Sequence, residues 1–203
     1  MKITYENKQM EIEEKTTVDK LFEKQIKENK YQVLGCRYNN EYRNLETEIE
    51  DGAKISLIDT KSKEGMKIYI RTLVYIMGKA FERLYPNEKL TVEYQLGDAM
   101  FCKCDKIKIT NEFVENLKEE ITKIVEENLE IKKVEMTRQK NEKFYEKNNT
   151  SKGRLQFDLK QNKIIYMYFC EDYYNYCFGT LANRTGVIKI FDIIKYQDGF
   201  LIR

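Results

Sequence analysis

The sequence predicts an α+β protein of two domains, residues 1–61 and 66–203, in which helices pack against mainly antiparallel sheets. Three observations indicate this. Short segments that alternate apolar and polar residues, as half-buried strands do, recur along the chain. Between them lie a few segments with apolar residues at helical spacing. The charged fraction of 34% and the apolar fraction of 41% are typical of a globular protein, and 203 residues can bury a core in each domain.

The first domain is predicted to have the order ββαββ. Residues 1–5 and 9–13 alternate around "ENK" and suggest a hairpin. "TTVDKLFEKQIKE" has apolar residues at helical spacing after Thr16 or Thr17, either of which can cap a helix. "YQVLGCRYNN" and "AKISLID" then read as strands, and Asn39-Asn40 supplies a turn. The polar segment "TKSKEG" marks the domain boundary.

The second domain is predicted to begin with a helix over residues 67–85, which ends before Pro86. "KLTVEYQL" and "AMFCKCDKIKI" read as strands. An amphipathic helix follows Thr110 or Asn111, and "TRQKNEKFYEKN" is a short charged helix. The remaining strand-like segments are "KIIYMYF", "YNYCF", "GVIKIFDIIKY" and "FLIR".

Composition excludes several functions. The chain has no histidine, so catalysis by a serine–histidine or cysteine–histidine pair and metal binding through histidine are excluded within it. Its 36 basic and 34 acidic residues argue against a strongly basic nucleic-acid module, although a local basic face fits such a balance. No segment resembles a signal peptide or a membrane span, so we expect a cytoplasmic protein that does not bind membranes. Five cysteines without a disulfide-like spacing indicate free thiols.

Two motifs do not match the binding sites that they partly resemble. "LVYIMGKAF" is not a phosphate-binding P-loop, because Leu73 replaces the first glycine and Ala80 follows the Gly-Lys pair. Cys102 and Cys104 lie on one face of a strand without the C-x-x-C turn that zinc sites favour, so we interpret them as buried free cysteines.

Two further segments have both a structural and a functional interpretation. Arg71, Tyr75 and Lys79 recur every four residues on the helix, either as a solvated edge or as the wall of a cleft. "YMYFCEDYYNYCF" could stack bases or hold an acid–base pair, Glu171 with Asp172. Adjacent strand residues face opposite sides, however, which favours alternating core residues and an aromatic turn.

The residues also carry a family resemblance over the whole chain. Residues 1 to about 60, with "TTVDKLF", "CRYNNEYRNL" and "EDGAKISLI", resemble a TGS domain, the ubiquitin-like (β-grasp) module at the start of threonyl-tRNA synthetases. Residues 67–203 resemble the editing-type second additional domain of threonyl- and alanyl-tRNA synthetases, on "IRTLVYIMGKAFERLYP", "YFCEDYYNYCFG" and "DGFLIR". The resemblance implies a β-grasp domain followed by an α+β editing-like domain.

The family's editing residues are mostly replaced. Its H-x-x-x-H pair falls on Arg71 and Tyr75, its later histidine on Leu181 and its acidic residue on Asn175, while Cys177 is retained. The resemblance therefore implies no catalytic residue and no metal site here. It leaves a degenerate cleft whose candidate ligand-binding residues are Arg71, Tyr75, Lys79, Arg154, Tyr173, Asn175 and Cys177, with Arg154 aligned only loosely.

A TGS domain joined to a histidine-depleted editing-like domain also resembles the N-terminal region of bacterial uridine kinase-like nucleoside kinases. That resemblance implies a downstream P-loop kinase domain in cis, to which ATP and magnesium would belong, and no cofactor in this chain. The function expected from it is a non-catalytic accessory or regulatory region whose cleft binds a small ligand, a nucleotide or RNA.

Two alternatives stay open. The chain could be a tRNA-binding module that uses Lys61, Lys63, Lys67 and Arg71 near the domain junction. It could also be a residual aminoacyl-tRNA deacylase that uses Cys177 with Arg154 or Tyr75. A thiol without a neighbouring base is mostly protonated near neutral pH, which argues against the deacylase.

Overall fold

The computed structural model describes residues 1–13, 15–148 and 164–203. Its first unit is a five-stranded sheet of order β2-β1-β5-β3-β4. β1 and β5 pair in parallel, and the other neighbours are antiparallel. The elements are β1 (Lys2–Tyr5), β2 (Lys8–Glu11), α1 (Val18–Leu21), α2 (Glu23–Glu28), β3 (Val33–Tyr38), β4 (Glu41–Arg43) and β5 (Lys54–Asp59).

This strand order, with two hairpins around a parallel central pair, is the predicted β-grasp arrangement. Two details differ from the prediction. The single predicted helix is split into α1 and α2 at Phe22, whose side chain is fully buried in the core of this unit. The short strand β4 was not predicted, although the turn before it was: Asn39 and Asn40 both adopt the left-handed conformation, with φ of 47° and 70°.

A 22-residue helix, α3 (Lys63–Leu84), follows the first unit directly. The Ser62 hydroxyl caps it by accepting a hydrogen bond from the Gly65 amide at 3.0 Å. The prediction that α3 begins near Lys67 was wrong, because its first turn is polar and largely exposed and carries no apolar periodicity. The helix ends at Leu84 with Tyr85 as its C-cap, before Pro86, as predicted.

One face of α3 packs against α4 (Asn111–Glu127) and a four-stranded antiparallel sheet of order β11-β12-β7-β6. Thr110 caps α4, as predicted, by accepting a hydrogen bond from the Phe113 amide at 3.1 Å. The strands are β6 (Leu90–Leu96), β7 (Ala99–Cys104), β11 (Ile193–Tyr196) and β12 (Gly199–Ile202). The strand predicted from "GVIKIFDIIKY" begins only at Ile193, after a 3-10 turn, η1 (Thr185–Val187).

A three-stranded antiparallel sheet of order β10-β9-β8 lies against another part of α3. It consists of β8 (Lys132–Thr137), β9 (Ile164–Cys170) and β10 (Tyr173–Tyr176), and α5 (Arg138–Asn148) follows β8. The last two strands and α5 were predicted, whereas β8 was not. With this sheet the predicted fold class, α+β with mainly antiparallel sheets, is confirmed.

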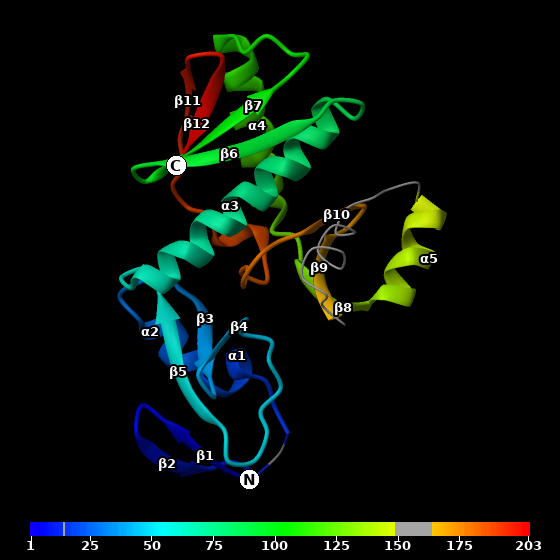
Figure 1. Ribbon diagram of the computed structural model, residues 1–203. Coiled ribbons are helices and arrows are strands. Elements are labelled where there is room, and N and C mark those ends of the chain that lie inside the picture. Colours follow the sequence, from blue (N-terminus) through cyan, green and yellow to red (C-terminus); the bar gives the residue numbers. More distant parts are fainter. Residues whose placement is uncertain (14, 149–163) are drawn as a thin grey trace.

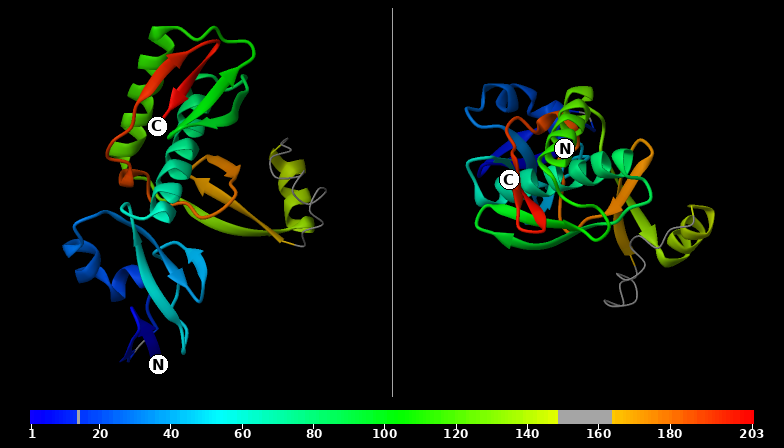
Figure 2. Two further views of the ribbon diagram at one scale, coloured as in Figure 1. Left: turned by 60° about the vertical axis from the view of Figure 1, so that its left-hand side comes forward. Right: turned by 90° about the horizontal axis from the view of Figure 1, so that it is seen from above.

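Figure 1 shows α3 crossing the middle of the molecule between the five-stranded and four-stranded sheets. The three-stranded sheet and α5 project to one side of this body, as both views in Figure 2 show. Hydrogen bonds join the units: Thr180 Oγ1 donates to the Tyr42 carbonyl at 2.7 Å, and Asn183 Nδ2 donates to Glu46 at 3.0 Å. In the described residues, no helix is both long and apolar enough to cross a membrane.

Candidate functional site

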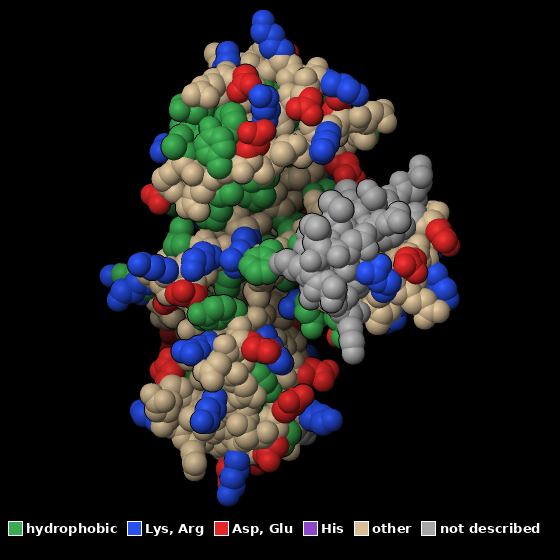
Figure 3. All heavy atoms as spheres, viewed as in Figure 1, with side chains coloured by type: hydrophobic (Ala, Val, Ile, Leu, Met, Phe, Trp, Pro, Cys, Tyr) green, Lys and Arg blue, Asp and Glu red, His purple; other side chains and the backbone are tan. Residues whose placement is uncertain are grey.

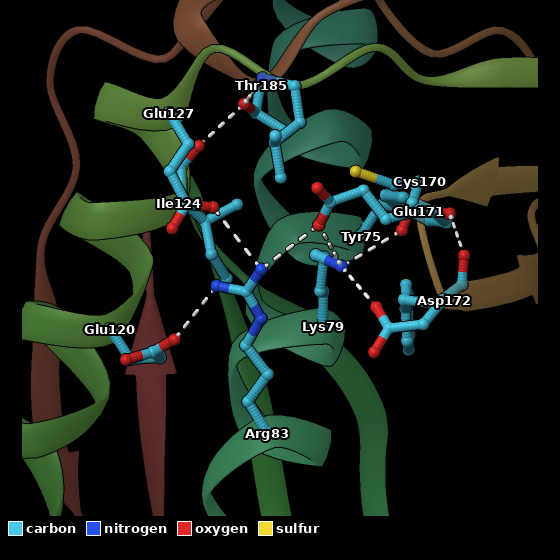
Figure 4. A network of polar contacts seen from close by, with 12 residues as sticks. Tyr75, Lys79, Arg83, Glu120, Ile124, Glu127, Cys170, Glu171, Asp172 and Thr185 are labelled. Atoms are coloured by element: carbon cyan, nitrogen blue, oxygen red, sulfur yellow. Dashed lines mark hydrogen bonds and ion pairs between the residues drawn. The ribbon is translucent and has the colours of Figure 1, made fainter.

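The row of Arg71, Tyr75 and Lys79 predicted on α3 is buried at its last two members. Tyr75 and Lys79 are only 2% and 1% exposed, although both have polar ends. Their spacing of four residues continues to Arg83, so three polar side chains leave α3 on one side and point toward α4 and the β9–β10 turn (Figure 4). The expected open cleft wall is thus absent at Tyr75 and Lys79, because a strand hairpin from later in the chain covers this side of the helix.

Lys79 is held by three oxygen atoms of that hairpin. Its Nζ donates to the Cys170 carbonyl at 3.0 Å and to Asp172 Oδ1 at 2.8 Å, and lies 3.2 Å from Glu171 Oε2. The ammonium of Lys79 lowers the pKa of Asp172, mainly through their hydrogen bond. Both carboxylates therefore form ion pairs with one buried cation.

This arrangement corrects the expectation that Glu171 and Asp172 face opposite sides of a strand. The two residues form the turn between β9 and β10, and Glu171 has a φ of 53°. The alternation of side chains applies only within an extended strand, so the rule used for the prediction does not hold at a turn.

Arg83 extends the contacts to α4. Its guanidinium lies 3.2 Å from Glu171, 3.1 Å from Glu120 and 3.3 Å from Glu127. The contacts of Lys79 and Arg83, here called the Lys79–Arg83 network, connect α3, α4 and the β9–β10 turn. The sequence prediction missed Arg83 and its α4 partners. A usable signal was present, since Arg83 continues the four-residue spacing and the acidic positions are one heptad apart.

Tyr75 lies in an aromatic cluster that fills the predicted cleft. Its hydroxyl donates to the Tyr168 carbonyl at 3.0 Å, and its ring centroid lies 5.0 Å from that of Tyr173 in an edge-on contact. Burial raises the pKa of Tyr75, so its phenol stays protonated. The buried members of this cluster, here called the tyrosine cluster, are Tyr75, Ile131, Tyr168, Cys170, Tyr173 and Leu181.

Gly78 makes this packing feasible. A Cβ at this position would collide with the hydroxyl of Tyr173, which is itself buried. The Gly-Lys pair of α3 therefore has a structural explanation: the glycine admits the tyrosine, and Lys79 holds the turn that precedes it.

The side chains of Cys177 and Asn175 are also engaged in packing and hydrogen bonds within the fold. Cys177 is half-buried against the tyrosine cluster, and burial raises the pKa of its thiol to about 12 despite the opposing effect of the Arg71 charge. Such a thiol is not a nucleophile near neutral pH. The Asn175 amide donates to the Tyr173 hydroxyl at 3.0 Å and accepts the Tyr176 amide hydrogen bond at 2.9 Å.

Arg71 is a predicted site residue that keeps some contact with solvent. It is half-buried, and its guanidinium lies over Gly179, where a Cβ would come within 2.7 Å of Nη1. The structure thus brings Arg71, Tyr75, Cys177 and Leu181 into one region, as the aligned motif positions implied. Arg154 lies outside the described residues, and ligand binding by the predicted set stays a prediction.

Within the described part of the chain, no group of three or more cysteine or acidic side chains converges as metal ligands would. All five cysteines are free, and Cys102 and Cys104 are buried on β7, as predicted for structural thiols. The tyrosines and Cys177 offer no deprotonated group near neutral pH, and Lys79 is engaged. The geometry therefore supports binding at the exposed surface near Arg71 better than hydrolysis in the interior.

No family model matches this chain. Among curated proteins it is similar to threonine–tRNA ligases. It is 27% identical over 203 residues to that of Clostridium novyi, covering 98% of this chain and 32% of the ligase. It is 28% identical over 170 residues to that of Clostridium tetani, covering 83% and 27% of the two chains. It is 27% identical over 173 residues to that of Oceanobacillus iheyensis, covering 84% and 27%.

The chain spans about a third or less of the length of these relatives. Over nearly its whole length it is nevertheless similar to one part of them, which supports a threonyl-tRNA-synthetase-like region and agrees with the resemblance seen in the sequence.

Proposed function

We propose that this chain is a tRNA-binding module of threonyl-tRNA synthetase type that does not carry out editing hydrolysis. The observation that carries the proposal is a row of basic residues along the first half of α3, here called the α3 stripe: Lys63, Lys67 and Arg71. Similarity to threonine–tRNA ligases supplies the class of ligand, and the filled cleft removes the chemistry.

The α3 stripe is suited to phosphate contacts. Its residues are four apart, so they lie on one side of the helix, with the two lysines exposed and Arg71 half-buried. Figure 3 shows Lys and Arg side chains gathered in a band across the middle of the molecule, at the height of the start of α3. A local positive band of this kind attracts a polyanion even when net charge is only +2.

Two other functions have less support. A deacylase would need room for a substrate and a water beside a basic group, whereas Tyr75, Tyr173 and Leu181 fill that space. The second of these functions is that of an accessory region of a nucleoside kinase. The relatives described above are synthetases and not kinases, so they lend it no support.

The test is binding of tRNA as a function of salt. We expect log affinity to fall linearly with log salt concentration, and Lys67→Glu to weaken binding and reduce the slope by about 1 or more. Lys123→Glu is a matched control on α4. Lys67 and Lys123 are 60% and 62% exposed, and their nearest acidic groups lie three residues earlier at 3.7 and 3.6 Å.

If both variants bind tRNA as the unmodified protein does, or if no salt-dependent binding is found, the proposal is wrong. A parallel assay of mischarged tRNA should show no deacylation above the rate without protein. Deacylation that disappears in Cys177→Ala would instead establish the hydrolytic alternative.

A further inference from the structure

An exposed tyrosine lies between two lysines next to the start of the α3 stripe. Tyr31, in the loop between α2 and β3, is 37% exposed. Lys30 Nζ lies 5.5 Å from the centroid of its ring, and Lys61 Nζ lies 5.7 Å from the same centroid. Both distances fall within the range of cation–π attraction, so the ring has a cation from its own loop and one from the segment that leads into α3.

Backbone hydrogen bonds fix this arrangement. The Tyr31 amide donates to Asn29 Oδ1 at 3.0 Å, which shapes the loop. The Thr60 amide donates to the Gln32 carbonyl at 2.9 Å, which joins the Tyr31 loop to the segment that carries Lys61. Ser62 then caps α3, so Lys61 stands one residue before the cap and two residues before the first lysine of the stripe. Tyr31 and its two lysines therefore lie next to the start of the α3 stripe.

The local charge favours an anion. In the described part of the chain, neither Lys30 nor Lys61 has a carboxylate within ion-pair distance, and both are exposed. The positive end of the helix dipole of α3 lies in the same place, which adds to the attraction for phosphate. Proteins that bind single-stranded nucleic acids combine exposed aromatic rings, on which bases stack, with nearby cations that contact the adjoining phosphates.

We propose that Tyr31, Lys30 and Lys61 form a stacking platform for an unpaired base of the bound RNA, at the end of the α3 stripe. This inference rests on the proposed function, since it assigns to the same RNA a second contact of a different kind. The stripe contacts phosphates whether or not the bases are paired, whereas the platform requires a base that is free to stack.

The first experiment compares variants of Tyr31. Tyr31→Ala should weaken binding of tRNA and of a single-stranded oligouridine by about fivefold or more, the range expected for loss of one stacked base. Tyr31→Phe should bind as the unmodified protein does, because the ring and not the hydroxyl supplies the stacking. Lys61→Ala should reduce the salt slope for the single strand by about 0.7. Circular dichroism of each variant checks that the fold is kept.

The second experiment uses the absence of tryptophan from the chain. Tyr31→Trp places a single fluorophore on the platform, and Tyr94→Trp places one on β6, where Tyr94 is 44% exposed. Single-stranded oligouridine should quench the fluorophore at position 31 and leave that at position 94 unchanged, and duplex RNA of equal length should quench neither.

The outcomes separate the two proposals. If Lys67→Glu weakens tRNA binding but Tyr31→Ala does not, and no quenching occurs at position 31, the platform is wrong while the proposed function stands. If the unmodified protein binds neither RNA, the proposed function fails and the platform with it.

Discussion

The Lys79–Arg83 network makes a prediction about which partner can be removed at lower cost. Lys79 is a buried cation, yet its two carboxylate partners are largely hydrated, with side chains 52% and 84% exposed. In Lys79→Met the aliphatic stem is replaced by a side chain of similar shape, and the cost of burying an ammonium disappears. The Cys170 carbonyl loses a donor, which costs about 1–3 kcal/mol, and the exposed carboxylates rehydrate at little cost.

Neutralising the two carboxylates instead leaves the buried cation without a partner of opposite charge. In the double variant Glu171→Gln/Asp172→Asn, the ammonium of Lys79 stays buried with only the Cys170 carbonyl and two neutral amides around it. Breaking a buried ion pair from one side costs about 3–5 kcal/mol, and the lower end applies here because the turn faces solvent. The double variant should therefore lose about 3 kcal/mol in the free energy of unfolding. Lys79→Met should lose about 1 kcal/mol, because removing the cost of burying the ammonium partly offsets the lost hydrogen bond.

Urea unfolding followed by circular dichroism measures both losses, provided that the slope of the transition stays constant among variants. Lys132→Met is a suitable control, because Lys132 is an exposed lysine on β8 whose partner, Glu130, is also hydrated. If Lys79→Met destabilises the protein more than the double carboxylate variant does, the argument from unequal hydration of the partners is refuted.

Three further changes have expected outcomes. Cys177, whose pKa burial raises to about 12, should react with iodoacetamide at neutral pH far more slowly than the same thiol in urea, and mass spectrometry that finds rapid modification of the native protein would contradict this. Asp172 has a lowered pKa, so its stabilising effect is fully present above its ordinary value of 3.8 and lost as the pH falls through the lower folded-state value. The stability of Asp172→Asn should not show that loss at acid pH. If the stability of the variant and of the unmodified protein changes equally with pH, the prediction is wrong. Thr72→Val should cost about 1–3 kcal/mol in urea unfolding, because the buried Ala182 amide then loses its acceptor, Thr72 Oγ1 at 2.9 Å; an unchanged midpoint would show that the amide finds another partner.

Local signals in the sequence predicted much of the fold. The cap and apolar spacing of α4, and the paired asparagines before β4, act over a few residues and were interpreted correctly. β8 was missed because its sequence, "KKVEMT", is half charged and gives a weak strand signal. Its place in the sheet comes from pairing with β9, whose partner residues lie about thirty positions later, for example Thr137 with Ile164.

The places of Tyr75 and Lys79 on α3 were predicted, but the surroundings of their side chains were not. Spacing correctly placed Tyr75 and Lys79 on one side of α3 with Arg71. Whether that side is open depends on the β9–β10 hairpin, whose turn reaches Lys79 from a sequence separation of 91 residues. No local pattern encodes such a contact, and the strand rule applied to Glu171 and Asp172 failed because both residues lie in the turn.

Tyr75 and Leu181, at positions where the resemblance places editing histidines, act as packing groups. Tyr75 fills its position with a ring that meets Tyr173 and with a hydroxyl that satisfies the Tyr168 carbonyl, and Leu181 is 1% exposed within the same cluster. A hydrolytic site must admit a water and a substrate to a polar cavity, and filling that cavity with well-packed side chains stabilises the fold while closing it to both. The two lysines of the α3 stripe, Lys63 and Lys67, lie outside the cluster and remain exposed. A filled cleft and the proposed RNA binding are thus compatible in one structure, because Tyr75 of the tyrosine cluster and the exposed lysines belong to different turns of the same helix.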